Sequence, residues 1–175
     1  MPTRPADPIV ILTGPPGAGK TTVARLLAER HARSVHLESD LFFHFVARGY
    51  VEPWRTESHD QNAAVMGIVG DAAIGYARAG YWTIVDGIVI PGWFYEPLRD
   101  AILAAGFEAA LVVLRPPLEV ALERASGRRE RPLSDAAVVE QLWRSFSSLG
   151  ELEPHVLDNA GQTPEETATE VTARL

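Results

Sequence analysis

Residues 9–22 read IVILTGPPGAGKTT, and this stretch decides the fold of the 175-residue chain. An apolar run leads into a glycine-rich turn, and a helical pattern follows directly. The turn matches G-x-x-x-x-G-K-[ST], the pattern of a phosphate-binding P-loop, in the strand–turn–helix setting that this motif requires. The sequence therefore predicts a strand over residues 8–13 and a helix from Thr21 to about Arg33, joined by a loop that holds a phosphate chain.

The predicted loop carries the groups that a nucleoside triphosphate and Mg²⁺ need. Glycines let the backbone curve closely around phosphate, so that consecutive N–H groups and the start of the helix face its charge. Lys20, the single lysine among 16 basic residues, is expected to reach the β- and γ-phosphates, and the Thr21 hydroxyl to join the Mg²⁺ shell. The alternative, a glycine turn that merely joins strand to helix, would not require the complete motif. The residues expected to bind the nucleotide are Gly14, Pro15, Gly17, Ala18, Gly19, Lys20, Thr21 and Thr22.

Composition narrows the class of protein. Apolar residues make up 46% and charged residues 22% of the chain, as in ordinary globular proteins, and the length predicts one domain, 1–175. Cysteine is absent, which excludes disulfides and thiolate chemistry. No segment resembles a signal peptide or a membrane span, so we expect a cytoplasmic protein. The net charge of −7 argues against a nucleic-acid partner, and both a monomer and a homodimer remain open.

Strand-length apolar runs alternate with helical patterns along the rest of the chain. Further strands are expected at 35–38, 82–87, 109–114 and 155–158. Helices are expected at 41–49, 59–79, 94–105, 117–126 and 134–149, and after the capping box Thr163-x-x-Glu166. This alternation is typical of a parallel sheet with helices on both faces. The predicted fold class is α/β: a three-layer P-loop NTPase fold with a five-stranded parallel sheet.

Two carboxylates follow predicted strands, at the sheet edge where ligands bind. Asp86 closes the strand 82–87 and is expected to hold Mg²⁺ through water; the alternative is an Asp-Gly turn that only ends the strand. Asp40 follows the strand 35–38 and is expected to accept the proton of an attacking hydroxyl next to the γ-phosphate. A helix N-cap is the alternative for Asp40, compatible with catalysis, and Ser39 could fill that cap instead.

Positive charge is densest between Arg124 and Arg131. A solvated surface run is the usual interpretation of such a segment. Here the segment lies between two helices after the fourth strand, so the preferred interpretation is an arginine-rich lid over residues 127–134. Arg128 and Arg131 are then the catalytic cations that cover the transferring phosphoryl group, and Arg124 is assigned to nucleotide binding.

Ten of the 14 aromatic residues fall in two windows, 42–54 and 81–95, and each window is expected to lie close to the carboxyl end of a strand that carries a candidate acid. Each ring could equally belong to the core, but together they indicate an acceptor pocket with apolar walls. His44 and Glu57 are further polar groups near this pocket. The residues expected to bind the substrate are Phe43, Trp54, Arg55, His59 and Trp93.

With these parts located, the chain resembles the small P-loop kinases, a group that includes shikimate kinase, gluconate kinase and chloramphenicol phosphotransferase. The resemblance covers nearly the whole chain, and its most specific part is Gly14 to Thr22. It implies that Asp40 is the base for the acceptor hydroxyl and that Arg128 and Arg131 are lid arginines. It also implies that residues 158–164, with Asn159, contact adenine. The aromatic acceptor region departs from the shikimate and gluconate sites, so the substrate does not carry over.

These features predict an ATP- and Mg²⁺-dependent kinase that phosphorylates a hydroxyl of a small molecule, with antibiotics and related metabolites as one candidate class. A nucleotide or nucleoside kinase is an alternative, as is a toxin-like kinase or an NTP-binding regulatory switch. A GTPase switch of the familiar kind is disfavoured, because its Asn-Lys-x-Asp motif needs a second lysine and the sequence has none.

Overall fold

A five-stranded parallel sheet forms the centre of the computed structural model, which describes residues 7–127 and 135–175. The strand order is β2-β3-β1-β4-β5. The strands are β1 (Ile9–Thr13), β2 (Ser34–Glu38), β3 (Trp82–Gly87), β4 (Ala109–Leu114) and β5 (Val156–Leu157). The predicted α/β fold with five parallel strands is confirmed.

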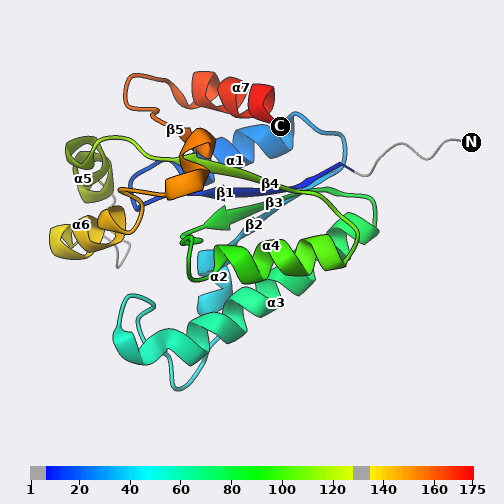
Figure 1. Cartoon of the computed structure of the whole chain (residues 1–175), viewed down its shortest axis with the longest axis horizontal. Coiled ribbons are helices and arrows are strands. Elements are labelled where there is room, and N and C mark those ends of the chain that lie inside the picture. Colours follow the sequence, from blue (N-terminus) through cyan, green and yellow to red (C-terminus); the bar gives the residue numbers. More distant parts are fainter. Residues whose placement is uncertain (1–6, 128–134) are drawn as a thin grey trace, which may run out of the picture.

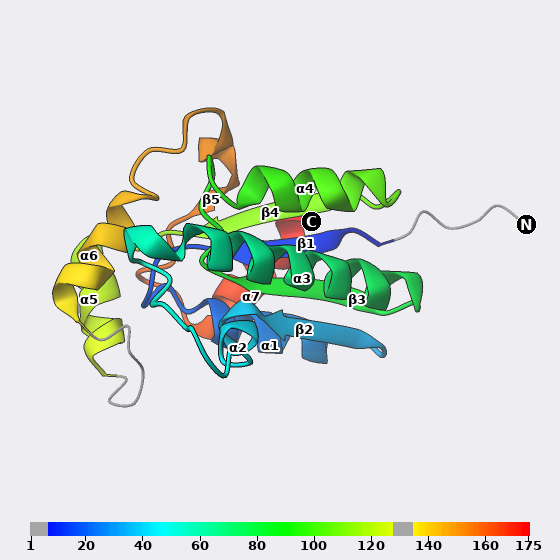
Figure 2. The ribbon, with the colours of Figure 1, turned by 90° about the horizontal axis from the view of Figure 1, so that it is seen from below.

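Helices cover both faces of the sheet, as the alternating pattern predicts. Figure 1 shows α1 and α7 on one face and α2, α3 and α4 on the other, and Figure 2 looks onto the second face. The helices are α1 (Lys20–Glu29), α2 (Ser39–Phe43), α3 (His59–Arg78), α4 (Tyr95–Ala104), α5 (Leu118–Ser126), α6 (Ala136–Arg144) and α7 (Pro164–Arg174), with 3₁₀ turns η1 (Thr56–Ser58) and η3 (Gly150–His155). Within the described ranges, none of them combines the length and apolar character that crossing a membrane requires.

The central strand β1 is buried on both faces, which explains its unbroken apolar sequence. Ile9 and Ile11 pack into the core beneath α3 and α4, whereas Val10 and Leu12 pack into the core beneath α1 and α7. In the parallel register, Leu12 of β1 lies opposite Asp86 of β3 on one side. The strand that leads into the P-loop is therefore fixed from both sides, and so is the start of the loop.

Two predicted helices are shorter than the sequence pattern suggests. The helix expected at 41–49 is α2, whose last turn tightens into i→i+3 bonds, including one from the Val46 N–H to the Phe43 carbonyl. The helix expected at 134–149 has its described part at Ala136–Arg144. The last predicted helix begins as expected, because the Thr163 hydroxyl accepts from the Glu166 N–H and the Glu166 carboxylate accepts from the Thr163 N–H.

The carboxyl ends of the strands all point towards one edge of the sheet, where α5 and α6 lie (Figure 1). The P-loop follows β1 at this edge, α2 follows β2, and the chain after β3 bends across the same region. Thr13 joins two of these segments, because its hydroxyl donates to the Val89 carbonyl at 3.1 Å and accepts from the Val89 N–H at 2.9 Å. The segments that follow β1, β2 and β3 are therefore gathered at the edge where parallel α/β sheets bind ligands.

Candidate active site

Three glycines shape the P-loop between β1 and α1. Gly14, Gly17 and Gly19 have φ values of 142°, 80° and 90°, a region that favours glycine. A Cβ on Gly14 would lie 2.0 Å from the Leu114 carbonyl oxygen, and one on Gly17 would lie 2.1 Å from that of Ala121. Gly14 and Gly17 are therefore required by close packing against β4 and α5 as well as by their backbone conformation, whereas Gly19 is required by its backbone conformation alone.

A small hollow of about 30 Å³ lies over the P-loop. Lys20 lines it, and its ammonium donates to the Pro15 carbonyl at 3.0 Å. The N-terminal end of α1 and this ammonium offer positive partners for phosphate oxygens. The remaining polar residues that line the hollow are Thr21, Glu38, Asp40 and Asp86.

Asp86 is buried, with only 1% of its surface exposed, and one of its carboxylate oxygens lacks a hydrogen-bond partner among the described residues. Its Oδ2 lies 3.1 Å from His36 Nε2, while Oδ1 has no hydrogen-bond partner among the described residues. A buried carboxylate oxygen without a partner is unfavourable, and Mg²⁺ or a water bound to it is a partner that suits this oxygen. The sequence did not indicate His36, although it lies on β2, the strand beside β3.

The described residues fit a magnesium ion that shares its shell with phosphate. Nowhere in residues 7–127 and 135–175 do three His, Asp or Glu side chains gather into a ready-made metal cage. Mg²⁺ in nucleotide sites instead takes one or two protein oxygens and completes its shell with water and phosphate oxygens. Thr21 and Asp86 line the hollow together with Glu38 and Asp40, so protein oxygens of the kind that such an ion needs are present there.

A second cluster joins the P-loop to the segment after β5. Asn159 is buried and its Nδ2 donates to the Ala18 carbonyl at 3.0 Å. The Arg124 guanidinium, from α5, donates to the carbonyls of Asn159 at 3.1 Å and Ala160 at 3.2 Å. The structure thus places Arg124 and Asn159 together beside the loop, on the side where the sequence predicts adenine contacts.

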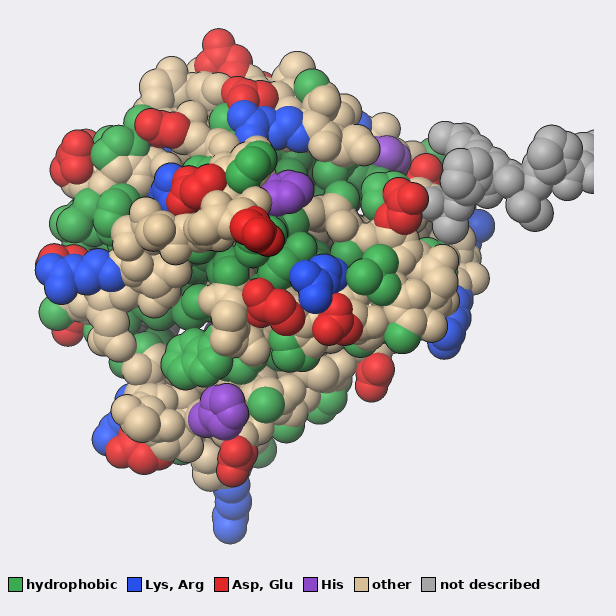
Figure 3. Space-filling view, in the orientation of Figure 1, with side chains coloured by type: hydrophobic (Ala, Val, Ile, Leu, Met, Phe, Trp, Pro, Cys, Tyr) green, Lys and Arg blue, Asp and Glu red, His purple; other side chains and the backbone are tan. Residues whose placement is uncertain are grey.

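A larger cavity of about 320 Å³ adjoins the hollow. Its walls come from α2, the segment 50–54, α3, the chain after β3, and the region of α6. Glu38, Asp40 and Ile88 line both spaces, so that Asp40 borders the P-loop hollow on one side and the cavity on the other. In Figure 3, hydrophobic side chains lie in a recess between α6 and the start of α3. The apolar and aromatic lining residues are Leu41, Phe43, Tyr50, Pro53, Trp54, Met66, Ile88, Ile90, Trp93, Phe94 and Leu142.

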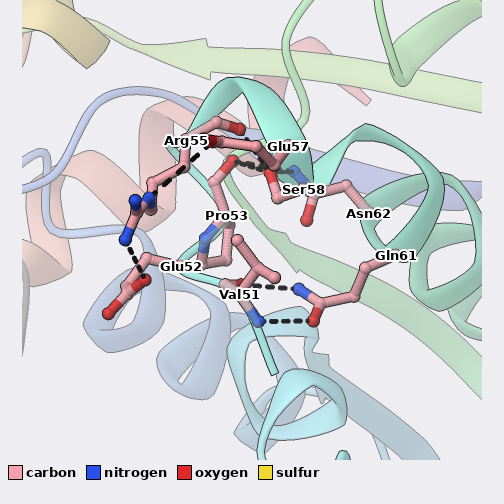
Figure 4. Close-up of polar contacts among 8 residues, drawn as sticks. All are labelled: Val51, Glu52, Pro53, Arg55, Glu57, Ser58, Gln61 and Asn62. Carbon is pink, nitrogen blue, oxygen red and sulfur yellow. Dashed lines mark hydrogen bonds and ion pairs between the residues drawn. The ribbon is translucent and has the colours of Figure 1, made fainter. Parts of the chain in front are cut away.

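The structure divides the residues predicted to bind the substrate. Phe43, Trp54 and Trp93 line the cavity, whereas Arg55 and His59 do not. Arg55 lies at the surface within 3.6 Å of Glu52 and 3.7 Å of Glu57 (Figure 4). The His59 ring lies beside Trp93 with 6.2 Å between ring centroids.

The second aromatic window is also divided, because the chain direction separates its members. Tyr81 and Trp82 stand at the start of β3, opposite the edge where ligands bind. Trp82 stacks on His31 at 3.7 Å between centroids, and Tyr81 packs edge-on against Tyr76. The expectation that the whole window lies near the carboxyl end of a strand is therefore wrong for these two rings.

Asn62 is a cavity residue that the sequence reasoning missed. It lies on the first turns of α3, is buried to 2% exposure, and lines the cavity together with Met66. Its Nδ2 donates to the Pro53 carbonyl at 2.7 Å and to the Ser58 hydroxyl at 2.9 Å, whereas Oδ1 has no partner among the described residues. A polar residue on the otherwise apolar face of a helix is the sequence signal that could have identified it. Gln141 and Ser145 also line the cavity and gave no such signal.

The irregular segment before α3 is held by side chains of η1 and α3 (Figure 4). The Gln61 amide pairs with Val51, accepting from its N–H at 2.9 Å and donating to its carbonyl at 2.7 Å. The Ser58 hydroxyl donates to the carbonyls of Pro53 at 2.9 Å and Arg55 at 2.7 Å. These bonds fix a segment without regular structure and so position Tyr50, Pro53 and Trp54 at the cavity.

Tyr50, which lines the cavity, lies close enough to Glu52 and Asp40 for their charges to act on its phenol. The pKa of the Tyr50 phenol is raised above its usual value, first by partial burial and then by the charges of Glu52 and Asp40.

The predicted lid cations Arg128 and Arg131 lie outside the described residues, as does all of the predicted lid except Gly127. Those assignments stay predictions.

Comparison with known proteins identifies the family. The sequence profile of a family described as an AAA domain matches residues 9–150, most of the chain. The chain belongs to this family. No curated protein matches the sequence significantly.

Solved structures with the same fold include several small P-loop kinases. The Mycobacterium tuberculosis APS kinase in complex with AMPPNP and APS is 20% identical, with a TM-score of 0.73 over 97% of this chain and 98% of that one. The tunicamycin resistance protein of Deinococcus radiodurans is 23% identical, with a TM-score of 0.72 over 95% and 94%. The shikimate kinase of Acinetobacter baumannii is 23% identical, with a TM-score of 0.69 over 95% and 91%. The predicted resemblance to small P-loop kinases is confirmed.

Proposed function

We propose that this protein is a kinase that transfers the γ-phosphate of ATP to a hydroxyl group of a small molecule. The observation that carries the proposal is the shared wall of the two spaces. Asp40 and Glu38 border both the hollow over the P-loop and the 320 Å³ cavity. A phosphate chain in the hollow and an alcohol in the cavity would therefore meet at Asp40.

Asp40 acts as the general base in this proposal. Its carboxylate accepts the proton of the acceptor hydroxyl as the oxygen attacks the γ-phosphorus. The bond from that phosphorus to the β–γ bridging oxygen breaks, and ADP leaves with the bridging oxygen. Lys20 and the N–H groups of the loop stabilise the charge on the phosphates. The predicted lid cations Arg128 and Arg131 would cover the same phosphoryl group from the segment between α5 and α6.

ATP and Mg²⁺ are the proposed partners of the P-loop site. ATP is supported by the APS kinase with this fold, whose complex holds AMPPNP, an analogue of ATP. Bound Mg²⁺ would neutralise charge on the phosphates, with Thr21 and the unsatisfied Oδ1 of Asp86 as its nearest protein groups. Arg124 and Asn159 would form the wall beside the adenine base of ATP.

An antibiotic or a related metabolite is one proposed class of acceptor. The tunicamycin resistance protein with this fold supports that class, and so do the aromatic walls of the cavity. Gluconate-like and shikimate-like acceptors receive less support, because such polar acids need more polar walls than this cavity has.

The proposal is tested by incubating purified protein with ATP, Mg²⁺ and a panel of hydroxylated metabolites and antibiotics. A member of the panel should gain the mass of one phosphoryl group. Lys20→Ala should abolish this gain, because the loop loses its phosphate cation, while the fold measured by circular dichroism stays the same. Phosphorylation that persists in Lys20→Ala would overturn the P-loop assignment.

A further inference from the structure

The carboxylate of Asp86 is held by a single side chain, that of His36 on the neighbouring strand. His36 Nε2 lies 3.1 Å from Asp86 Oδ2, and this is the only hydrogen bond to the carboxylate among the described residues. An ionised carboxylate can only accept hydrogen bonds, so Nε2 carries the proton and donates it. The orientation of the carboxylate therefore depends on His36.

Alternation along the strands places both residues on the face of the sheet that α1 covers. Their neighbours Leu37 and Val85 pack into the core beneath α3 and α4, so His36 and Asp86 point to the opposite face. In the parallel register His36 lies opposite Ile84, and its imidazole reaches diagonally along β3 to Asp86. Asp86 lines the hollow over the P-loop, whereas His36 is not among the described residues that line it. His36 thus supports a residue of the proposed phosphate site from outside the hollow.

The sheet does not need this contact to hold β2 in place. Backbone pairing already joins β2 to β3 along all five residues of β2. A carboxylate with 1% of its surface exposed is costly to bury, and an apolar side chain, as elsewhere in β3, would serve the strand pair better. The contact between His36 and Asp86 is therefore better explained by a requirement of the site than by the stability of the sheet.

Asp86 has the arrangement expected of a carboxylate that serves a metal ion. Hydrogen bonds orient such carboxylates, and losing one typically weakens metal binding by about 10- to 100-fold. His36 occupies Oδ2, while Oδ1 has no partner among the described residues. Resting on the Mg²⁺–ATP site of the function proposed above, we propose that His36 is a positioning residue for Mg²⁺. It holds the Asp86 carboxylate in the orientation that the ion or its bound water requires, and it acts only through Asp86.

Two amide variants test the role of His36 by their reach. A glutamine amide nitrogen can take nearly the position of imidazole Nε2, whereas that of asparagine falls short of Asp86 because its side chain is one methylene shorter. Calorimetry measures the affinity for AMPPNP with Mg²⁺ and with EDTA, and the ratio of the two affinities reports the contribution of the metal. His36→Asn should reduce this ratio about tenfold, with the affinity in EDTA nearly unchanged. His36→Gln should retain most of the ratio.

Two controls separate the positioning of Asp86 from a general loosening of the sheet edge. His31 lies just before β2 and stacks on Trp82, with 3.7 Å between ring centroids, so His31→Asn should leave the ratio unchanged. Asp86→Asn should itself reduce the ratio, and His36→Asn added to it should cause no further loss, because His36 acts through the carboxylate. Urea unfolding of each variant shows that the affinities belong to folded protein.

The outcomes distinguish the role of His36 from the kinase function. An unchanged ratio in His36→Asn, an equal loss in His36→Gln or in His31→Asn, or a further loss in the double variant would overturn the role of His36. A ratio near one in the unsubstituted protein would overturn the metal site together with that role. Phosphoryl transfer is followed separately by mass. If the ratios change as expected but no alcohol gains phosphate, the kinase function fails while the role of His36 stands.

Discussion

Gly17 is required both by its backbone conformation and by the close packing of the chain around it. Its φ of 80° lies in the left-handed region, and the space beside it is filled by the backbone of α5 at Ala121. Gly49 has a similar φ of 77° but nothing within 4 Å of a Cβ. Alanine substitutions at Gly17 and Gly49 therefore separate the energetic cost of backbone strain from that of close packing.

Gly17→Ala should lower the free energy of unfolding more than Gly49→Ala does. The Gly49 substitution should cost about 1 kcal/mol from backbone strain alone. The Gly17 substitution should cost about 2 kcal/mol more, because α5 must move away from the loop. Urea unfolding of both variants measures the difference. An equal loss of unfolding free energy in the two variants would show that α5 moves away from the loop without an energetic cost.

The single substitution Asp40→Asn tests whether this residue is the general base. The amide keeps the shape of the side chain but cannot take the proton, so phosphoryl transfer should fall by about 10²- to 10⁴-fold. ATP binding, measured by calorimetry, should stay nearly unchanged. A large loss of ATP affinity instead would assign Asp40 a role in metal binding or in holding the loop.

Residue types in a fixed local pattern were predictable, whereas contacts across the fold were not. The spacing of Gly14, Lys20 and Thr21 specifies a P-loop because the motif and its chemistry lie within one short stretch. His36 contacts Asp86 across 50 positions of sequence, and Asn62 reaches the cavity only because α3 packs below the sheet. The contact of His36 leaves no periodic or spacing signal in the sequence, and the only signal of Asn62 is that it is a polar residue on the otherwise apolar face of α3.

At the scale of elements, an ion pair ties the chain after β4 to the turn η3. Arg115 donates to the Glu153 carboxylate at 2.9 and 2.8 Å and to the Phe146 carbonyl at 2.8 Å. The Leu149 N–H also donates to that carboxylate. Hydrogen bonds from Arg115 and then from the Leu149 backbone lower the pKa of Glu153 to about 2 from an ordinary value of 4.5.

This depressed pKa predicts how Glu153→Gln changes stability with pH. Because the folded state holds Glu153 in its charged form, the stabilising contribution is complete above about pH 4.5 and is lost as the pH falls towards 2. Glu153→Gln should therefore lower the urea midpoint at pH 7, and its difference from the unsubstituted protein should shrink between pH 4.5 and 2. A constant difference across this range would show that the charge of Glu153 contributes nothing.

The positions of elements were predicted better than their ends. β3 and β4 have the expected bounds because long apolar runs define them, and α7 begins at the predicted capping box. α2 ends earlier than the pattern suggests, because the backbone after Phe43 continues in i→i+3 bonds only as far as Val46 and Phe45 is exposed rather than part of a buried helical face. The segment 50–58 has no periodic pattern, and side chains of η1 and α3 hold it.

On the scale of the whole molecule, the parallel sheet brings two binding spaces to one edge. The P-loop, α5 and the segment after β5 surround the proposed nucleotide side, whereas α2, α3 and the region of α6 surround the cavity. The sequence predicts this common edge, because parallel strands end together. It does not predict which aromatic residues line the cavity and which lie in the core, since that depends on packing between helices far apart in the chain.

The most direct test of the central claim is a structure of the protein with Mg²⁺, AMPPNP and an alcohol that the protein phosphorylates. The acceptor hydroxyl should lie about 3 Å from the Asp40 carboxylate and in line with the γ-phosphorus. The rest of the acceptor should fill the cavity beside Trp54 and Trp93. An acceptor bound outside this cavity, or a hydroxyl that Asp40 does not contact, would contradict the account.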